Sequence, residues 1–146
     1  MFRNPRILPA LLLLIASSAL ASCAKSPATT PTPTELLDYT RQGGLLGTDD
    51  HLVVYDSGAV TLTQRGAPIA VTIDTATLDR LKSQIAAADF DHLDPAYGPE
   101  FGCCDQFTHR LRYRGRAVRA LDDVAPERLR ALLVTLSQII GARRSG

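Results

Sequence analysis

The stretch that decides the fold is residues 51–73, HLVVYDSGAVTLTQRGAPIAVTI. Apolar and polar residues alternate through its middle and end, which is typical of strands with one buried face. Asp-Ser-Gly at 56–58 and Arg-Gly at 65–66 supply turn residues between these runs. Residues 36–41 have the pattern of an earlier strand. The first half of the domain is therefore predicted to be a β-meander.

Helical spacing follows the meander. Asp74 or Thr75 can cap a helix whose apolar residues recur three or four positions apart, and the stripe is Leu78, Leu81, Ile85 and Ala88. A loop rich in proline and glycine covers residues 94–102. Strand alternation returns over 107–113 and 116–121, separated by an Arg-Gly turn. A final helix is expected from Pro126, with a stripe made of Leu129, Leu132, Leu133, Leu136 and Ile140.

This order of elements contains no strand–helix–strand alternation, so a parallel sheet is not expected. The prediction is a two-layer α+β fold with an antiparallel sheet of four to six strands. Both helices should pack on one face of that sheet, in the order β-meander, helix, hairpin, helix. The chain of 146 residues has room for a single domain of this kind, which we place at residues 35–144.

The N-terminal residues have the features of an export signal. Arg3 and Arg6 precede an apolar run over residues 7–20, which is too short for the roughly 20 residues that a spanning helix needs. The run ends in Leu20-Ala21-Ser22-Cys23, which resembles the lipobox of bacterial lipoprotein precursors. The resemblance implies that residues 1–22 are removed and that Cys23 carries a lipid. Ordinary secretion and an uncleaved anchor are the alternatives.

A lipid on Cys23 would hold the protein at the cell envelope. A single acyl chain gives marginal binding, whereas the two or three chains of a lipoprotein give stable residence. Ala24 is not the aspartate that often marks inner-membrane retention in this family. We therefore expect the outer membrane if one is present, and otherwise the outer face of the plasma membrane. Residues 23–34 hold the lipidated cysteine and a spacer rich in proline and threonine, about 30 Å long.

Charge is distributed unevenly along the chain, although the total is only +1. Residues 35–105 contain 4 basic and 12 acidic residues, a net charge of −8, whereas residues 106–146 contain 9 basic and 3 acidic residues, a net charge of +6. Either the two parts pair with each other, or the arginines form a patch for an acidic partner. The near-neutral total argues against a nucleic-acid partner.

Cys103 and Cys104 are adjacent in a chain that we expect in an oxidising compartment. Neighbouring Cα atoms lie about 3.8 Å apart, closer than in ordinary disulfides. Three alternatives stay open: a strained vicinal disulfide that braces the loop, two packed thiols, and a metal or redox function. His109 could assist as a ligand, but its place between Phe107 and Leu111 favours a histidine at the edge of the core.

No arrangement of catalytic residues is visible. The serines lack a nucleophile-elbow context, and the three histidines lie in unrelated elements. Residues 89–100 fail as a calcium loop because Leu93 and Asp94 occupy positions that need an oxygen ligand and a glycine. We therefore expect no enzymatic activity, metal, cofactor or small-molecule substrate.

Several short segments in the right order resemble the emfourin family, bacterial inhibitors of the thermolysin-like protease protealysin and its relatives. They are YTRQGGLLG at 39–47, AADFDHL at 87–93, DQFTH at 105–109, GRAV at 115–118, and Pro126 followed by Leu129 and Leu132. The chain departs from the family in its lipobox, in residues 56–64, in its two adjacent cysteines and in His109. The resemblance implies a non-catalytic domain that binds a metalloprotease.

The segment Gly43, Gly44, Leu45, Leu46 and Gly47 is the candidate contact with such a partner, because thermolysin-like enzymes favour a bulky apolar residue just after the scissile bond. Alternatively, both leucines turn into the core and the glycines merely permit the turn. Two other functions stay open: an accessory envelope lipoprotein without a discrete ligand, and a thiol-based metal or redox module at Cys103 and Cys104.

Overall fold

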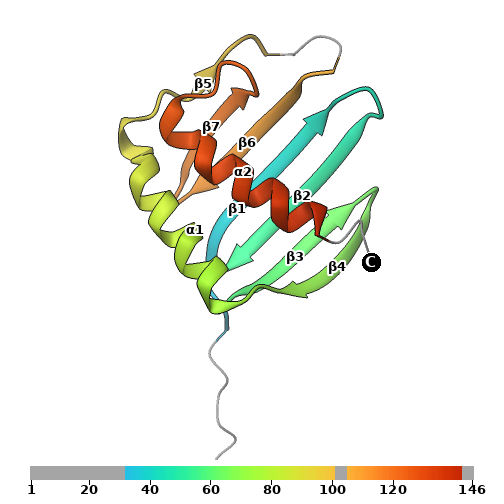
Figure 1. Ribbon diagram of the computed structural model, residues 1–146, viewed down its shortest axis with the longest axis vertical. Helices are drawn as coiled ribbons and strands as arrows, with labels where there is room; N and C mark the ends of the chain where they lie inside the picture. Colours follow the sequence, from blue (N-terminus) through green and yellow to red (C-terminus); the bar gives the residue numbers. More distant parts are fainter. Residues whose placement is uncertain (1–31, 101–104, 143–146) are drawn as a thin grey trace, which may run out of the picture. The chain divides into compact units, whose positions relative to one another are not determined.

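A computed structural model describes residues 32–100 and 105–142 of the chain. The domain in these residues is α+β, with one seven-stranded sheet and two helices (Figure 1). The strands lie in the order β4-β3-β2-β1-β6-β7-β5. Their bounds are β1 Glu35–Gly43, β2 Thr48–Tyr55, β3 Ala59–Gln64, β4 Ala67–Thr72, β5 Ala96–Tyr97, β6 Phe107–Tyr113 and β7 Arg116–Leu121; the helices are α1 Thr75–Ala88, the short 3₁₀ helix η1 Phe90–His92, and α2 Glu127–Gly141.

The prediction of four to six strands in an antiparallel sheet is wrong on both points. The seventh strand, β5, has two residues and runs parallel to β7, which makes the sheet mixed. It lies within the segment expected to be a loop, and two residues cannot show an alternating pattern. β5 depends on tertiary contact instead, since the Arg119 N–H donates to the Pro95 carbonyl at 3.0 Å.

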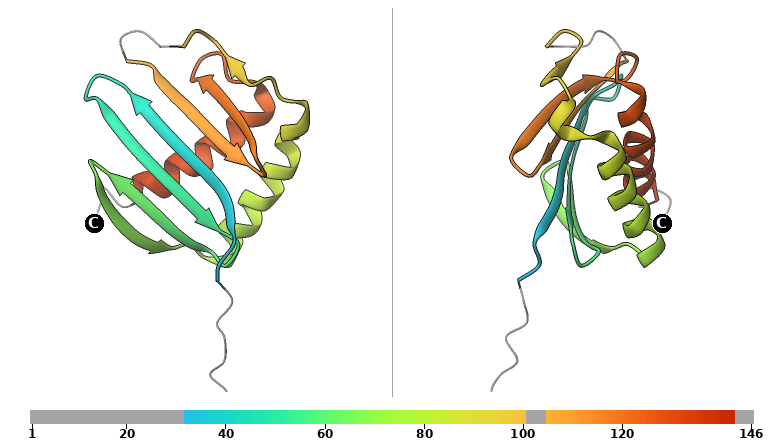
Figure 2. Two further views of the ribbon diagram at one scale, coloured as in Figure 1. Left: turned by 180° about the vertical axis from the view of Figure 1, so that it is seen from behind. Right: turned by 90° about the vertical axis from the view of Figure 1, so that its left-hand side faces the viewer.

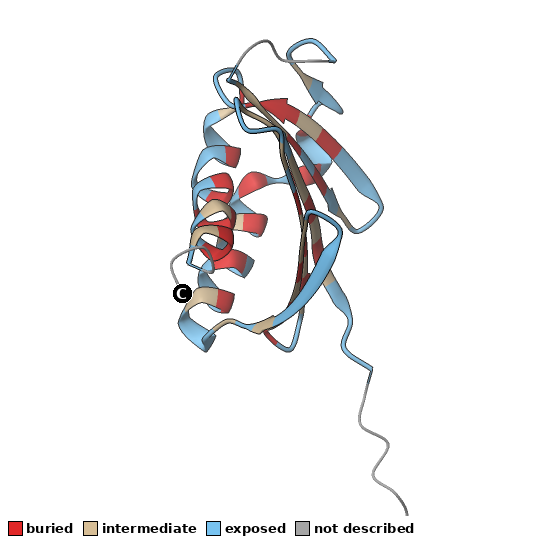
Figure 3. Ribbon diagram, turned by 90° about the vertical axis from the view of Figure 1, so that its right-hand side faces the viewer, coloured by how far each residue is buried: buried red, intermediate tan, exposed pale blue. Residues whose placement is uncertain are grey.

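Both helices cover the same face of the sheet, as seen edge-on in Figure 2, and they leave the other face open. The predicted apolar stripes are confirmed: they are buried between the helices and the sheet (Figure 3). Asp74 caps α1, because its side chain accepts a hydrogen bond from the Thr77 N–H at 2.8 Å. Pro126 directly precedes α2 in an extended conformation.

β1 lies at the centre of the sheet and fixes the positions of the residues discussed below. It pairs antiparallel with β2 on one side and with β6 on the other. The chain enters the domain at the Glu35 end of β1, and the β1–β2 turn lies at the opposite end (Figure 1). A nine-residue strand spans about 30 Å. The entry point and the turn are therefore separated by the length of the sheet.

Candidate functional site

The β1–β2 turn presents two leucines to solvent. The Gly47 N–H donates to the Gly44 carbonyl at 3.0 Å, so residues 44–47 form a β-turn with Leu45 and Leu46 at its centre. Leu45 is 85% exposed and Leu46 is 90% exposed. The alternative in which both leucines turn into the core is therefore wrong. We call residues 43–47 the leucine tip.

Glycines allow the leucine tip to lie close to the start of β6. Gly43 and Gly44 have φ values of 116° and 70°, which side-chain-bearing residues rarely adopt. A Cβ atom on Gly43 would lie 2.4 Å from the Gln106 carbonyl oxygen, and one on Gly44 would lie 2.8 Å from the Phe107 ring. The Gly44 N–H also donates to the Gln106 carbonyl at 3.1 Å. This hydrogen bond and the close approach of the two glycines hold the base of the tip against the start of β6.

A buried ion pair braces the two strands beneath the tip. Asp50 is 1% exposed, and one of its carboxylate oxygens accepts from Arg41 Nη2 at 2.6 Å and from Arg41 Nε at 3.2 Å. The Gln64 amide donates to the other oxygen at 2.7 Å, which extends the network to β3. The Arg41 guanidinium also lies over the Phe107 ring, 5.1 Å from its centroid. The network links β1, β2, β3 and β6 under one turn.

A second buried network of hydrogen bonds includes His109. The Tyr39 hydroxyl donates to His109 Nδ1 at 2.7 Å, and His109 Nε2–H donates to the Asp122 carboxylate. We assign this tautomer because an ionised carboxylate can only accept. The other Asp122 oxygen accepts from the Phe107 N–H at 3.1 Å. His109 is 3% exposed, so the prediction of a histidine at the edge of the core is confirmed.

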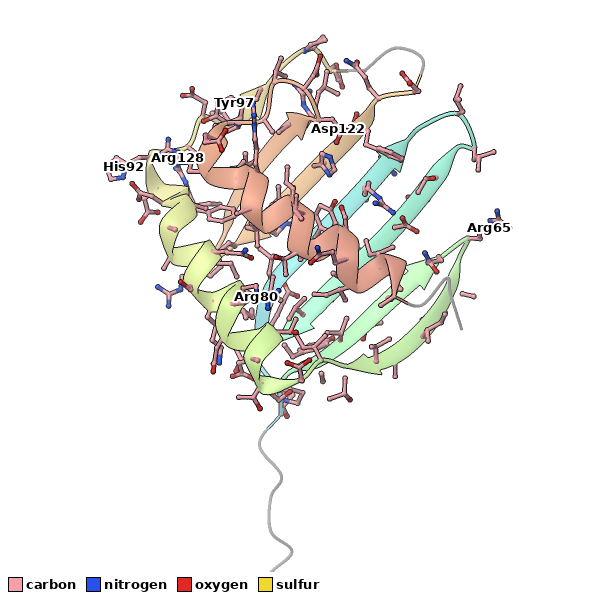
Figure 4. All side chains as sticks on the ribbon, in the orientation of Figure 1. Arg65, Arg80, His92, Tyr97, Asp122 and Arg128 are labelled. Carbon is pink, nitrogen blue, oxygen red and sulfur yellow. The ribbon has the colours of Figure 1, made fainter. Side chains whose placement is uncertain are left out.

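A hollow of about 590 Å³ opens beside His109 and Asp122, against Arg130, Val134 and Ser137 of α2. Asp122 is labelled in Figure 4, near the end of β7. Both ring nitrogens of His109 are engaged, and the Tyr39 hydroxyl is buried. Burial raises the pKa of Tyr39 far above its ordinary value, against a smaller opposing effect of the Ser137 hydrogen bond. These hydrogen bonds therefore link the sheet to α2 through Ser137, and they leave His109 no free ring nitrogen toward the hollow.

Titration of His109 provides a test of this hydrogen-bond network. Burial lowers the pKa of His109 below its ordinary value of 6.5 and outweighs Asp122, whose hydrogen bond and charge act in the opposite direction. The fold therefore favours neutral His109. The contribution of neutral His109 to the free energy of unfolding is complete above about pH 6.5. It is lost as the pH falls from there toward the lower pKa that His109 has in the folded state. The measurement is an NMR titration of the imidazole protons, with urea unfolding followed from about pH 7 to about pH 5.

A His109→Gln variant serves as the control, because it should lose the part of the pH dependence that comes from the buried imidazole. An imidazole resonance of His109 that titrates above its ordinary pKa would contradict the account. That result would show that Asp122, and not burial, governs the site.

Three predicted site residues, Cys23, Cys103 and Cys104, lie outside the described residues. In the described part of the chain, no three histidine, cysteine, aspartate or glutamate side chains are grouped in a way that could hold a metal ion. Within residues 32–100 and 105–142, neither helix has the length and apolar character needed to cross a bilayer.

The sequence reasoning missed Asp50, Tyr39 and Asp122 as members of these networks. A signal was present for Asp50, which precedes Leu52 by two residues and therefore shares the buried face of β2. No protein-family model matches this chain, and a search of curated proteins found no match.

Proposed function

We propose that this protein is a non-catalytic binding module, anchored to the cell envelope through a lipid on Cys23, whose leucine tip contacts a protein partner. The observation that carries the proposal is the exposure of Leu45 and Leu46 on a turn whose two strands are joined by the Arg41–Asp50 ion pair and by the contact of Arg41 with Phe107. Burying a leucine side chain in a partner contributes about 1.5–3 kcal/mol. A rigid turn loses little conformational entropy on binding, so more of that contribution appears as affinity.

The partner class that we propose is a thermolysin-like metalloprotease, and the effect is inhibition. Two supports bear on this class: the resemblance of residues 39–47 to the emfourin family, and the preference of these enzymes for a bulky apolar residue after the scissile bond. A leucine on a narrow turn can enter a pocket that a flat surface cannot reach. The tip also lies at the end of β1 opposite to Glu35, so the length of the strand separates it from the point where the chain enters the domain.

An inhibition assay tests the proposal directly. The full-length protein, purified in a neutral detergent, is added in increasing amounts to a thermolysin-like metalloprotease and to an unrelated serine protease. We expect slow inhibition of the metalloprotease, complete when the two proteins are equimolar, and an unchanged serine protease. Unchanged hydrolysis by the metalloprotease at a large excess of the protein would contradict the proposal.

The anchor is tested separately with Cys23→Ala. This variant should move from the membrane fraction to the soluble fraction, because it removes the sulfur atom that would carry the acyl chains. Membranes are washed with carbonate, and the protein is followed by immunoblotting. Cys103→Ala is the matched control and should stay with the membranes. A Cys23→Ala protein that still sediments after the wash would rule out lipid anchoring at this residue.

A further inference from the structure

The face of the sheet opposite the helices carries a groove of about 720 Å³. Figures 2 and 3 show this face uncovered by either helix. Side chains from β1, β2, β6 and β7 line the groove, and its charged and polar residues are Asp38, Thr40, His51, Arg110, Arg112 and Arg119. None of the residues that line it belongs to the leucine tip, so this groove is a separate surface.

Three arginines are crowded on this face. Arg110 on β6 lies directly opposite Arg119 on β7, and Arg112 follows two residues along on the same face of β6. Like charges placed directly opposite each other destabilise a strand pair. The fold therefore keeps a repulsive pair in the lining of the groove.

The fold neutralises little of this charge. Asp38 is the one acidic residue in the lining of the groove, and it already contacts His51 Nε2 at 2.9 Å and Arg112 Nη1 at 3.6 Å. The Arg119 guanidinium donates to the carbonyls of Gly98 and Pro99. Arg110 has no hydrogen bond or ion pair within the described part of the chain, and Arg112 is 66% exposed. The Arg110 guanidinium is therefore free to bind an external anion, and the Arg112 guanidinium, which contacts Asp38 only at 3.6 Å, stays exposed enough to bind one as well.

The spacing of these two arginines indicates what kind of anion fits. Residues two apart on one face of a strand are separated by about 6.5–7 Å. Carboxylates on alternate residues of an extended peptide repeat at the same distance. Each guanidinium can bind a carboxylate through two parallel hydrogen bonds. We propose that the groove binds an extended acidic segment of a protein partner, with carboxylates on alternate residues contacting Arg110 and Arg112.

A membrane surface fits this groove less well. The groove is concave, whereas a lipid surface is flat. The large apolar side chains that the described residues expose are Leu45, Leu46, Ile69, Val124 and Val134, and none of them lines the groove. The surface thus has charge without the apolar side chains that membrane-binding faces insert.

Fluorescence anisotropy tests the proposal with the full-length protein in a neutral detergent. The probe is a dye-labelled decapeptide that alternates glutamate with threonine, and the reference is the same peptide with glutamine in place of glutamate. We expect the glutamate peptide to bind and the glutamine peptide not to bind. Arg110→Gln should weaken binding about tenfold, and Arg110→Gln with Arg112→Gln should weaken it further, since hydrogen bonds to charged groups are among the stronger ones.

The matched control is Arg65→Gln with Arg80→Gln, which removes the same charge from the β3–β4 turn and from α1 (Figure 4). It should leave binding unchanged. No variant should have a lower thermal midpoint than the wild type, because Arg110 and Arg112 are not in the core and Arg110→Gln removes a like charge opposite Arg119. Equal losses in both double variants would overturn the proposal by showing non-specific charge attraction.

Three other results would also overturn the proposal. They are absence of peptide binding, equal binding of a peptide whose glutamates are consecutive, and Arg110-dependent binding of anionic lipid vesicles without peptide binding. Protease inhibition by Arg110→Gln with Arg112→Gln should equal that of the wild type. This groove and the leucine tip are therefore tested independently of each other.

Discussion

Replacing Asp50 by alanine should lower the free energy of unfolding by about 3–5 kcal/mol, because it removes one partner of a buried ion pair. Asp50 is 1% exposed and accepts hydrogen bonds from Arg41 and from Gln64. Without its carboxylate, the Arg41 guanidinium stays in a largely buried position with no opposite charge beside it. The measurement is urea unfolding of the variant and the wild type.

Asp49→Ala is the matched control for this prediction. Asp49 is adjacent in sequence, but it lies on the open face of β2 and is exposed, where its side chain accepts a hydrogen bond from Gln42 at 3.1 Å. Exposed polar contacts of this kind contribute about 1 kcal/mol or less. Equal unfolding free energies for the two variants would show that the Arg41–Asp50 pair contributes nothing to the fold.

Helices α1 and α2 and six of the seven strands follow from sequence periodicity, because a repeating apolar face is a local property. β5 does not, since two residues beside Arg119 form a strand only where β7 is already in place. The inward direction of His109 was readable from the alternation of β6. Its partner Tyr39 is 70 residues away in sequence and meets it because β1 and β6 are neighbours, which no local pattern reveals.

The uneven distribution of charge along the sequence predicted part of the ion pairing. The expectation that the basic and acidic parts of the chain pair with each other is met by Arg112 with Asp38 at 3.6 Å and by Arg128 with Asp89 at 3.8 Å. Both contacts are long and partly exposed. The direction of Leu45 and Leu46 could not be settled from sequence, because a turn has no periodic face and its exposure depends on what lies above it.

Replacing Leu45 and Leu46 together by aspartate should abolish inhibition of a thermolysin-like metalloprotease while leaving the fold intact. Both side chains are exposed, so their replacement should change the free energy of unfolding by less than about 0.5 kcal/mol. Binding should fall sharply, because two buried leucines contribute about 3–6 kcal/mol and an aspartate placed in an apolar pocket adds a desolvation penalty. Val134→Asp, an exposed apolar-to-acidic change on α2, should inhibit as the wild type does.

The central claim is tested most directly by titrating one thermolysin-like metalloprotease with the wild type and with the Leu45→Asp, Leu46→Asp variant under the same conditions. Tight inhibition by the wild type and none by the variant, with equal urea midpoints, is the predicted result. Equally tight inhibition by both proteins would contradict the claim and place the contact elsewhere on the domain.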